Sequence, residues 1–164
     1  MAVLDDTAIA TVVALTVTAS FPCYLYGAWI VLQSETVTWG VLIHHLKFVG
    51  AGLALTTIPV ATWMVPRLVW GSVGFDSFTA LHVFLGVQAY ALLTFALTGI
   101  LRIFQVKRRH DLYNDPDPEM AISELHENMS AWRFRLRVGV FGYVILWLLA
   151  WVVGVARYIL VYLA

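Results

Sequence analysis

Hydrophobic positions along the chain form four long runs that are almost free of charge. A helix needs roughly 20 apolar residues to cross about 30 Å of hydrocarbon. The sequence therefore predicts an all-α integral membrane four-helix bundle, built as a single domain over residues 1–164. The spans are expected at about residues 7–31, 40–64, 78–103 and 132–162, with one polar segment at 104–131.

The amino-acid composition agrees with a membrane protein and excludes a soluble domain and a nucleic-acid-binding protein. Hydrophobic residues make up 61% of the chain and charged residues 12%, against about 25% charged residues in a soluble domain. Lys and Arg total ten, as do Asp and Glu, so no basic excess exists to neutralise nucleic-acid phosphates. Asp5 and Asp6 stand where a signal peptide carries basic residues, so we expect the first span to be retained. The prediction is a multi-pass protein of the plasma membrane with no nucleic-acid partner.

Basic residues concentrate between the third and fourth spans. The stretch from Arg102 to Arg137 holds seven of the ten Lys and Arg residues. Because cytoplasmic flanks of membrane helices are enriched in Lys and Arg, this segment is predicted to be cytoplasmic and both termini to lie outside. Six of its basic residues are predicted to contact anionic lipids or an interface. They are Lys107, Arg108, Arg109, Arg133, Arg135 and Arg137.

Within this polar segment, Asp117-Pro118-Glu119 has the composition of a helix start. The helix that would follow, through Met120 and Met129, has two open placements. It lies on the membrane or on a partner as a separate element, or it runs straight into the fourth span.

Small and polar residues inside the spans predict helix contacts. Gly50 with Ala54, and Ala150 with Gly154, stand one turn apart and favour close packing of helices. The Gln88 amide is expected to form an interhelical hydrogen bond. Arg157 lies near the outer end of the last span, where its side chain is expected to snorkel to the headgroups.

Carboxylates are missing from the middle of the spans. No Asp or Glu occurs between Asp6 and Glu35, nor in the cores of the other three spans. Proton pumps and ion-coupled transporters need such groups or discontinuous helices, so a transporter or channel ranks last. HExxH, CxxC, G-x-S-x-G and P-loop patterns are also absent from the sequence. We therefore predict no catalytic residue and no metal site.

Histidine is the one residue type that points to a cofactor, because neutral imidazole ligates haem iron. His44 and His45 lie near the inner end of the second span, and His82 near the outer end of the third, with Gly86 one turn later leaving room for a flat ring. At 1.5 Å per residue, His44 and His82 differ by roughly 24 Å in depth and cannot clasp one haem. Met64 at the outer face, or a residue of a second subunit, is a candidate partner for His82. His110 and His126 of the inner segment are candidates to fold back toward His44 or His45.

Two resemblances bear on function. The run Leu81–Gly86, continued by Thr98–Ile103, resembles the histidine-then-glycine helices of small bis-histidine transmembrane cytochromes b, which implies haem b as cofactor. As a whole the chain is similar to the small four-helix membrane proteins that accompany haloarchaeal cytochrome bc-type complexes. That similarity rests on Asp111-Leu112-Tyr113, on the run Glu124–Arg133 and on the Gly142-Tyr143 helix. It implies an archaeal protein whose partners are other membrane subunits of a redox complex.

The leading hypothesis is an accessory integral-membrane subunit of a respiratory electron-transfer complex of the quinol-oxidising, cytochrome bc type, with a structural role. The alternative is a b-type haem-binding electron carrier that uses His82, or the pair His44 and His45. A related variant is a quinone contact near His44, His45, Lys47 and Tyr26, where imidazole and phenol groups hydrogen-bond a quinone carbonyl.

Overall fold

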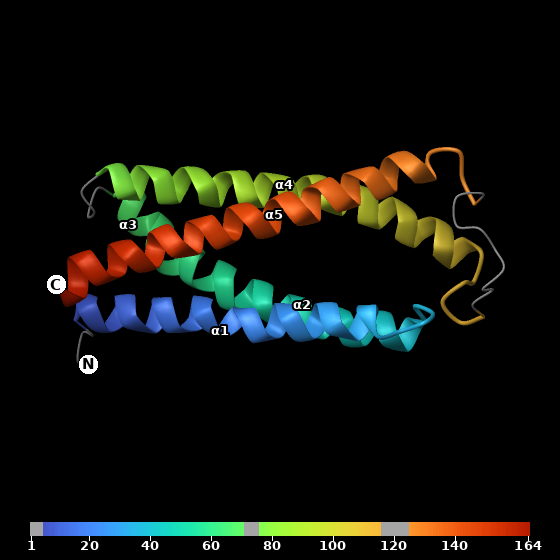
Figure 1. The fold of residues 1–164 in the computed structure, drawn as a ribbon, viewed down its shortest axis with the longest axis horizontal. Helices are drawn as coiled ribbons and strands as arrows, with labels where there is room; N and C mark the ends of the chain where they lie inside the picture. Colours follow the sequence, from blue (N-terminus) through green and yellow to red (C-terminus); the bar gives the residue numbers. More distant parts are fainter. Residues whose placement is uncertain (1–4, 71–75, 116–124) are drawn as a thin grey trace.

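The computed structural model describes residues 5–70, 76–115 and 125–164. Four long helices run along one another, and these residues contain no strand (Figure 1). Each of the four is long and apolar enough to cross a membrane, which confirms the predicted all-α four-helix membrane fold. The long helices are α1 (Asp6–Leu32), α2 (Trp39–Pro59), α4 (Ser77–Arg109) and α5 (Met129–Tyr158).

Two of the spans continue past their α-helices through π-helical turns. The turn η1 (Val60–Met64) follows Pro59 and leads into the short helix α3 (Val65–Val69), while η3 (Ile159–Leu163) extends α5. Proline has no backbone N–H, so a regular α-helical ladder cannot be completed at Pro59. Single π-turns of this kind are frequent at functional sites.

The segment between the third and fourth spans is shorter than expected from the sequence, because α4 continues to Arg109 and α5 begins at Met129. Residues 125–128 form a bend and a turn. The alternative in which one helix runs from residue 118 into the fourth span is therefore wrong. The predicted helix start at Asp117 and the positions up to Glu124 lie outside the described residues.

The helices pair as two hairpins, α1 with α2 and α4 with α5, and few contacts join one hairpin to the other (Figure 1). Glycines allow the close approach of α5 to α4: a Cβ added at Gly139 would lie 2.7 Å from the backbone nitrogen of Ala96. Small residues allow such backbone proximity in membranes. Gly50, predicted to pack with Ala54, has nothing within 4 Å of an added Cβ, so that face is open in this chain.

Hydroxyl groups provide the polar contacts between the hairpins. The Tyr24 hydroxyl of α1 lies 3.0 Å from Thr56 Oγ1 of α2 and 3.3 Å from the Tyr143 hydroxyl of α5. The Tyr90 hydroxyl of α4 lies 2.9 Å from Thr57 Oγ1 of α2. These hydrogen bonds therefore link all four helices: the junction at Tyr24 is partly buried, whereas the contact of Tyr90 with Thr57 is exposed.

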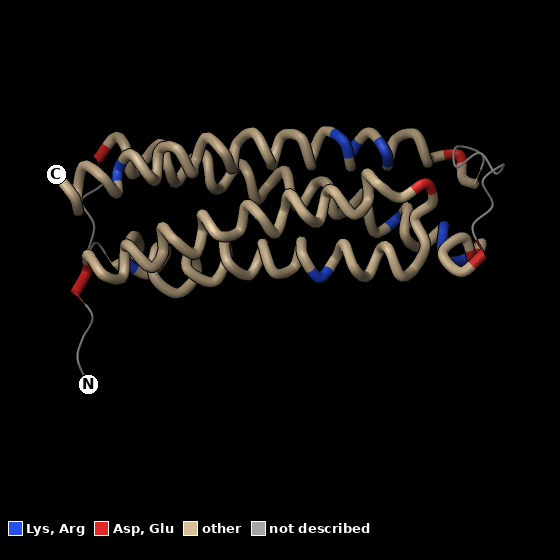
Figure 2. The backbone as a smooth tube through the Cα atoms, turned by 60° about the horizontal axis from the view of Figure 1, so that its bottom comes forward, with Lys and Arg blue, Asp and Glu red and all other residues tan. Residues whose placement is uncertain are grey.

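Charges lie mostly toward the ends of the bundle, with the majority of the basic residues in the half away from the termini (Figure 2). Both termini lie at the other end (Figure 1), which we call the terminal end. There Arg67 of α3 donates hydrogen bonds of 2.6 and 2.8 Å to the two carboxylate oxygens of Asp6 on α1. This arrangement agrees with the predicted placement of both termini on one side.

Replacing Tyr24 by Phe should lower the free energy of unfolding by about 1 kcal/mol, because it removes the hydroxyl shared by Thr56 and Tyr143. Thermal unfolding in a mild detergent measures the effect. Tyr26→Phe is the matched control, since Tyr26 is 47% exposed and no described residue hydrogen-bonds its hydroxyl. Equal unfolding temperatures for the two variants would contradict a structural role of the Tyr24 hydroxyl.

Candidate functional site

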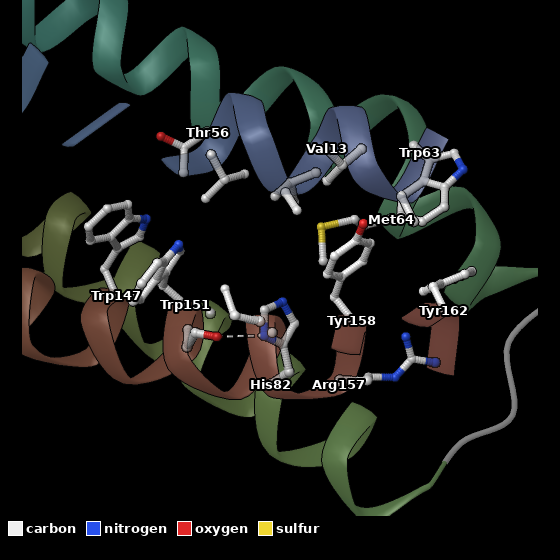
Figure 3. A pocket seen from close by; sticks show the side chains of 18 of the residues that line it. Val13, Thr56, Trp63, Met64, His82, Trp147, Trp151, Arg157, Tyr158 and Tyr162 are labelled. Atoms are coloured by element: carbon white, nitrogen blue, oxygen red, sulfur yellow. Dashed lines mark hydrogen bonds between the residues drawn. The ribbon is translucent and has the colours of Figure 1, made fainter. Parts of the chain in front are cut away.

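A cavity opens between the hairpins at the terminal end (Figure 3). It consists of two adjoining hollows of about 370 and 160 Å³, the larger of which reaches the size of a small-molecule site, about 300 Å³ or more. The larger hollow lies between η1–α3 and α4, and the smaller one continues inward between α1 and α5. Six residues that the two hollows share matter below: Trp63, Met64, His82, Gly86, Tyr90 and Arg157.

His82 projects from α4 into the cavity, and one of its two ring nitrogens is already hydrogen-bonded. Its Nδ1 lies 2.8 Å from the carbonyl oxygen of Ala150 on α5. A carbonyl only accepts, so Nδ1 carries the proton and donates, and in the neutral imidazole Nε2 keeps its lone pair. Figure 3 shows the ring among the cavity side chains, with the dashed hydrogen bond on one side. A backbone carbonyl bound in this way fixes tautomer and orientation, as it does for metal-ligating histidines.

Two glycines shape the space around His82. A Cβ added at Gly154 of α5 would lie 2.8 Å from His82 Cε1, so the absence of a side chain there lets the imidazole sit against α5. A Cβ added at Gly86 of α4 would meet nothing within 4 Å. Gly86 lines both hollows, so the wall of α4 is recessed one turn beyond His82.

Met64 reaches the same cavity from η1, on the opposite hairpin. It shares both hollows with His82 (Figure 3). The two residues that the sequence analysis considered as an outer-face pair are thus brought to one site. The π-turn after Pro59 carries Met64 and positions it on this wall.

Two arginines line the cavity near its outer end. Arg157 of α5 donates from Nε to Thr79 Oγ1 at 2.9 Å, which anchors it at the cavity. Arg67 lies 5.1 Å from the ring centroid of Trp63 and is held by Asp6. These two guanidinium groups line an otherwise apolar cavity, and that of Arg67 is already paired with the Asp6 carboxylate.

Asp76, directly before α4, supports this end. Asp76 caps α4 by accepting the backbone N–H of Thr79 at 2.6 Å. That hydrogen bond, aided by the Thr79 hydroxyl and by the charge of Arg157, holds the pKa of Asp76 below its usual range. Asp76 therefore stays ionised at neutral pH and fixes the position of Thr79.

Aromatic side chains close the inner part of the cavity. Trp147 and Trp151 of α5 line the smaller hollow, with ring centroids 4.5 and 5.0 Å from that of Phe21. Trp151 Nε1 donates to Thr18 Oγ1 at 3.2 Å. Their connection with His82 depends on how α5 is rotated, and hydropathy along the sequence does not specify that rotation.

The chain matches a family described as a domain of unknown function, DUF7321, over residues 6–163. The chain belongs to the DUF7321 family. No curated protein and no solved structure matches it. The family description names no activity.

The two inner histidines lie away from this cavity. His45 Nδ1 lies 2.8 Å from the carbonyl oxygen of Gly27, which ties α2 to α1. The exposed His44 ring has its centroid 6.2 Å from that of Tyr26 and 5.4 Å from that of Phe48. Neither histidine lines the cavity, in agreement with the expected difference in depth from His82.

The basic residues predicted at an interface lie on the half of the bundle away from the termini. Lys107 is partly buried, with Nζ 5.0 Å from the ring centroid of Tyr113. The other five, which are Arg108, Arg109, Arg133, Arg135 and Arg137, are exposed. In the described ranges 5–70, 76–115 and 125–164, no group of three or more His, Cys, Asp or Glu residues is placed to hold a metal ion.

Gly86→Leu should leave the unfolding temperature unchanged or raise it, because the new side chain enters open space and leucine favours helix. Gly154→Leu should lower the unfolding free energy by about 1–3 kcal/mol, because it displaces the His82 ring. Thermal unfolding of the two variants in the same detergent compares them directly. Equal losses of stability in the two variants would show that the recess at Gly86 is filled in the folded protein.

Proposed function

We propose that this protein is an integral-membrane subunit of a respiratory electron-transfer complex in the plasma membrane, and that it holds a b-type haem in the cavity beside His82. One observation carries the proposal. His82 is bound through Nδ1 to a backbone carbonyl and turns the lone pair of Nε2 toward an apolar cavity that is recessed at Gly86. Haem iron takes an imidazole nitrogen of this kind as an axial ligand.

The residues around His82 fit the other needs of a haem. Met64, on the opposite wall, supplies a thioether, the second ligand in His/Met haem proteins. The recess at Gly86 and the apolar walls suit a flat macrocycle. Arg157 at the outer end suits one of its carboxylates. When bound, the group would supply one-electron transfer, and the chain's part is to ligate, orient and shield it.

Met64 also bears on the choice between a purely structural subunit and a haem-binding electron carrier. On the sequence alone, haem binding is the alternative, because His44 and His82 differ too much in depth to share one haem. A thioether in the same cavity as His82 supports that alternative within one chain. Membership of a larger complex rests on the resemblance to proteins that accompany cytochrome bc-type complexes.

Anionic lipids are a proposed second partner at the inner surface. Arg133 and Arg137 lie one turn apart on α5 and are exposed, and the neighbouring Phe134 and Phe141 are 64% and 69% exposed. Basic groups beside exposed phenylalanines on one helix are typical of helices that bind an anionic leaflet. The quinone contact near His44, His45, Lys47 and Tyr26 stays a prediction; the ring cluster of Tyr26, His44 and Phe48 is its only support.

The protein purified from native membranes should show a Soret band and, after reduction, an α band. His82→Ala should lower haem content by at least about tenfold, since it removes the anchored ligand. Met64→Leu should retain haem with a lower reduction potential, because a thioether ligand raises it. His44→Ala is the control and should match the wild type. A colourless wild-type protein would leave only the structural role.

Extraction of native membranes in a mild detergent should recover the chain together with redox subunits that carry haem or iron–sulfur centres. Blue-native electrophoresis followed by peptide mass spectrometry identifies the co-migrating chains. A solitary chain with no redox subunit beside it would contradict membership of an electron-transfer complex, whatever its own spectrum.

A further inference from the structure

Gln88 places an amide on the outside of the bundle. The residue lies on α4 close to the middle of the predicted span 78–103, and its side chain is exposed. Nowhere in the part of the chain that the structure describes does a residue hydrogen-bond this amide, so the predicted interhelical bond is not made inside the chain. The apolar length of α4 puts this position in the hydrocarbon. An amide there lacks water and is costly without a partner.

The neighbours of Gln88 form a continuous exposed face. At helical spacing on both sides of it lie Phe84, Ala91 and Phe95, all exposed. Ala91 is small enough to let a second helix come close, and interfaces in membranes use small residues and amides together. We call Phe84, Gln88, Ala91 and Phe95 the amide face.

The amide face is separate from the other two sides of α4. Ala89, Ala96 and Gly99 are buried on the side that packs against α5. His82, Gly86 and Tyr90 line the cavity, whereas no residue of the amide face does. Figure 1 shows α4 at the edge of the bundle, away from α1. A helix docked on the amide face would therefore leave the cavity open.

We propose that two copies of this chain dimerise through the amide face, with the two Gln88 amides hydrogen-bonded to each other across a two-fold axis along the membrane normal. An amide carries both donor and acceptor, so it is complementary to itself, as an isologous contact requires. Copies inserted in the same direction also bring Gln88 to the same depth automatically. This inference is independent of the proposed haem.

Disulfide cross-linking in native membranes tests the contact. In a Cys23→Ala background, Ala91→Cys introduces one thiol on the amide face, and Ala54→Cys introduces one on the exposed side of α2 as the control. Mild oxidation should yield a covalent dimer with the first variant and leave the second monomeric. Adding Gln88→Leu to the Ala91→Cys variant should weaken self-association by about tenfold. Gln88→Asn should restore part of it.

Thermal unfolding is the control for correct folding of the Gln88→Leu variant. Leucine at a lipid-facing position should leave the unfolding of the monomer unchanged. Cross-linking that persists with Gln88→Leu would overturn the proposed role of the amide. A wild-type amide face that gives no dimer would overturn the dimer. Cross-linking of Ala91→Cys to a different protein alone would also overturn it, and would assign this face to another subunit.

Discussion

Hydroxyl-to-hydroxyl hydrogen bonds inside the bilayer hold the two hairpins in register. Lipid tails are as apolar as leucine, so the hydrophobic effect does not press one hairpin against the other, and dispersion and interhelical hydrogen bonds remain. Tyr24 meets Thr56 and Tyr143 at one junction, and Tyr90 meets Thr57 at another. Few other contacts join the hairpins, and the hydroxyl contact of Tyr90 with Thr57 links α2 directly to α4.

The cavity is a consequence of that arrangement. Beyond the junctions α2 leaves α1 and continues through η1 and α3 beside the start of α4 (Figure 1). The terminal end is held together by the bidentate pair of Arg67 with Asp6 and by the hydroxyl contact of 2.7 Å between Thr11 and Tyr158. Space remains between η1–α3 and α4, because Gly86 places no side chain there. His82 and Met64 meet in this space.

One helix carries most of the chemistry that the chain offers. One side of α4 packs against α5 through alanine and glycine, a second side presents His82 to the cavity, and a third side presents Gln88 to the bilayer. Both polar residues can be read from the sequence, but the role of each depends on hydrogen-bond partners that lie outside α4. His82 acquires a defined tautomer from a carbonyl of α5, whereas Gln88 acquires no partner within the described chain.

The membrane class, the four spans and the shared side of the termini follow from the sequence, because length and hydropathy are local, additive properties of each helix. The spacing of His82 and Gly86 likewise shows a ring-sized recess on one helix. Which residue faces His82 depends on the rotation and depth of other helices. Apolar residues surround these helices on all sides, so hydropathy does not specify that rotation. Only the tertiary structure decides that Met64 and Arg157 join His82, that His45 binds Gly27, and that Gly50 and Gln88 face outward.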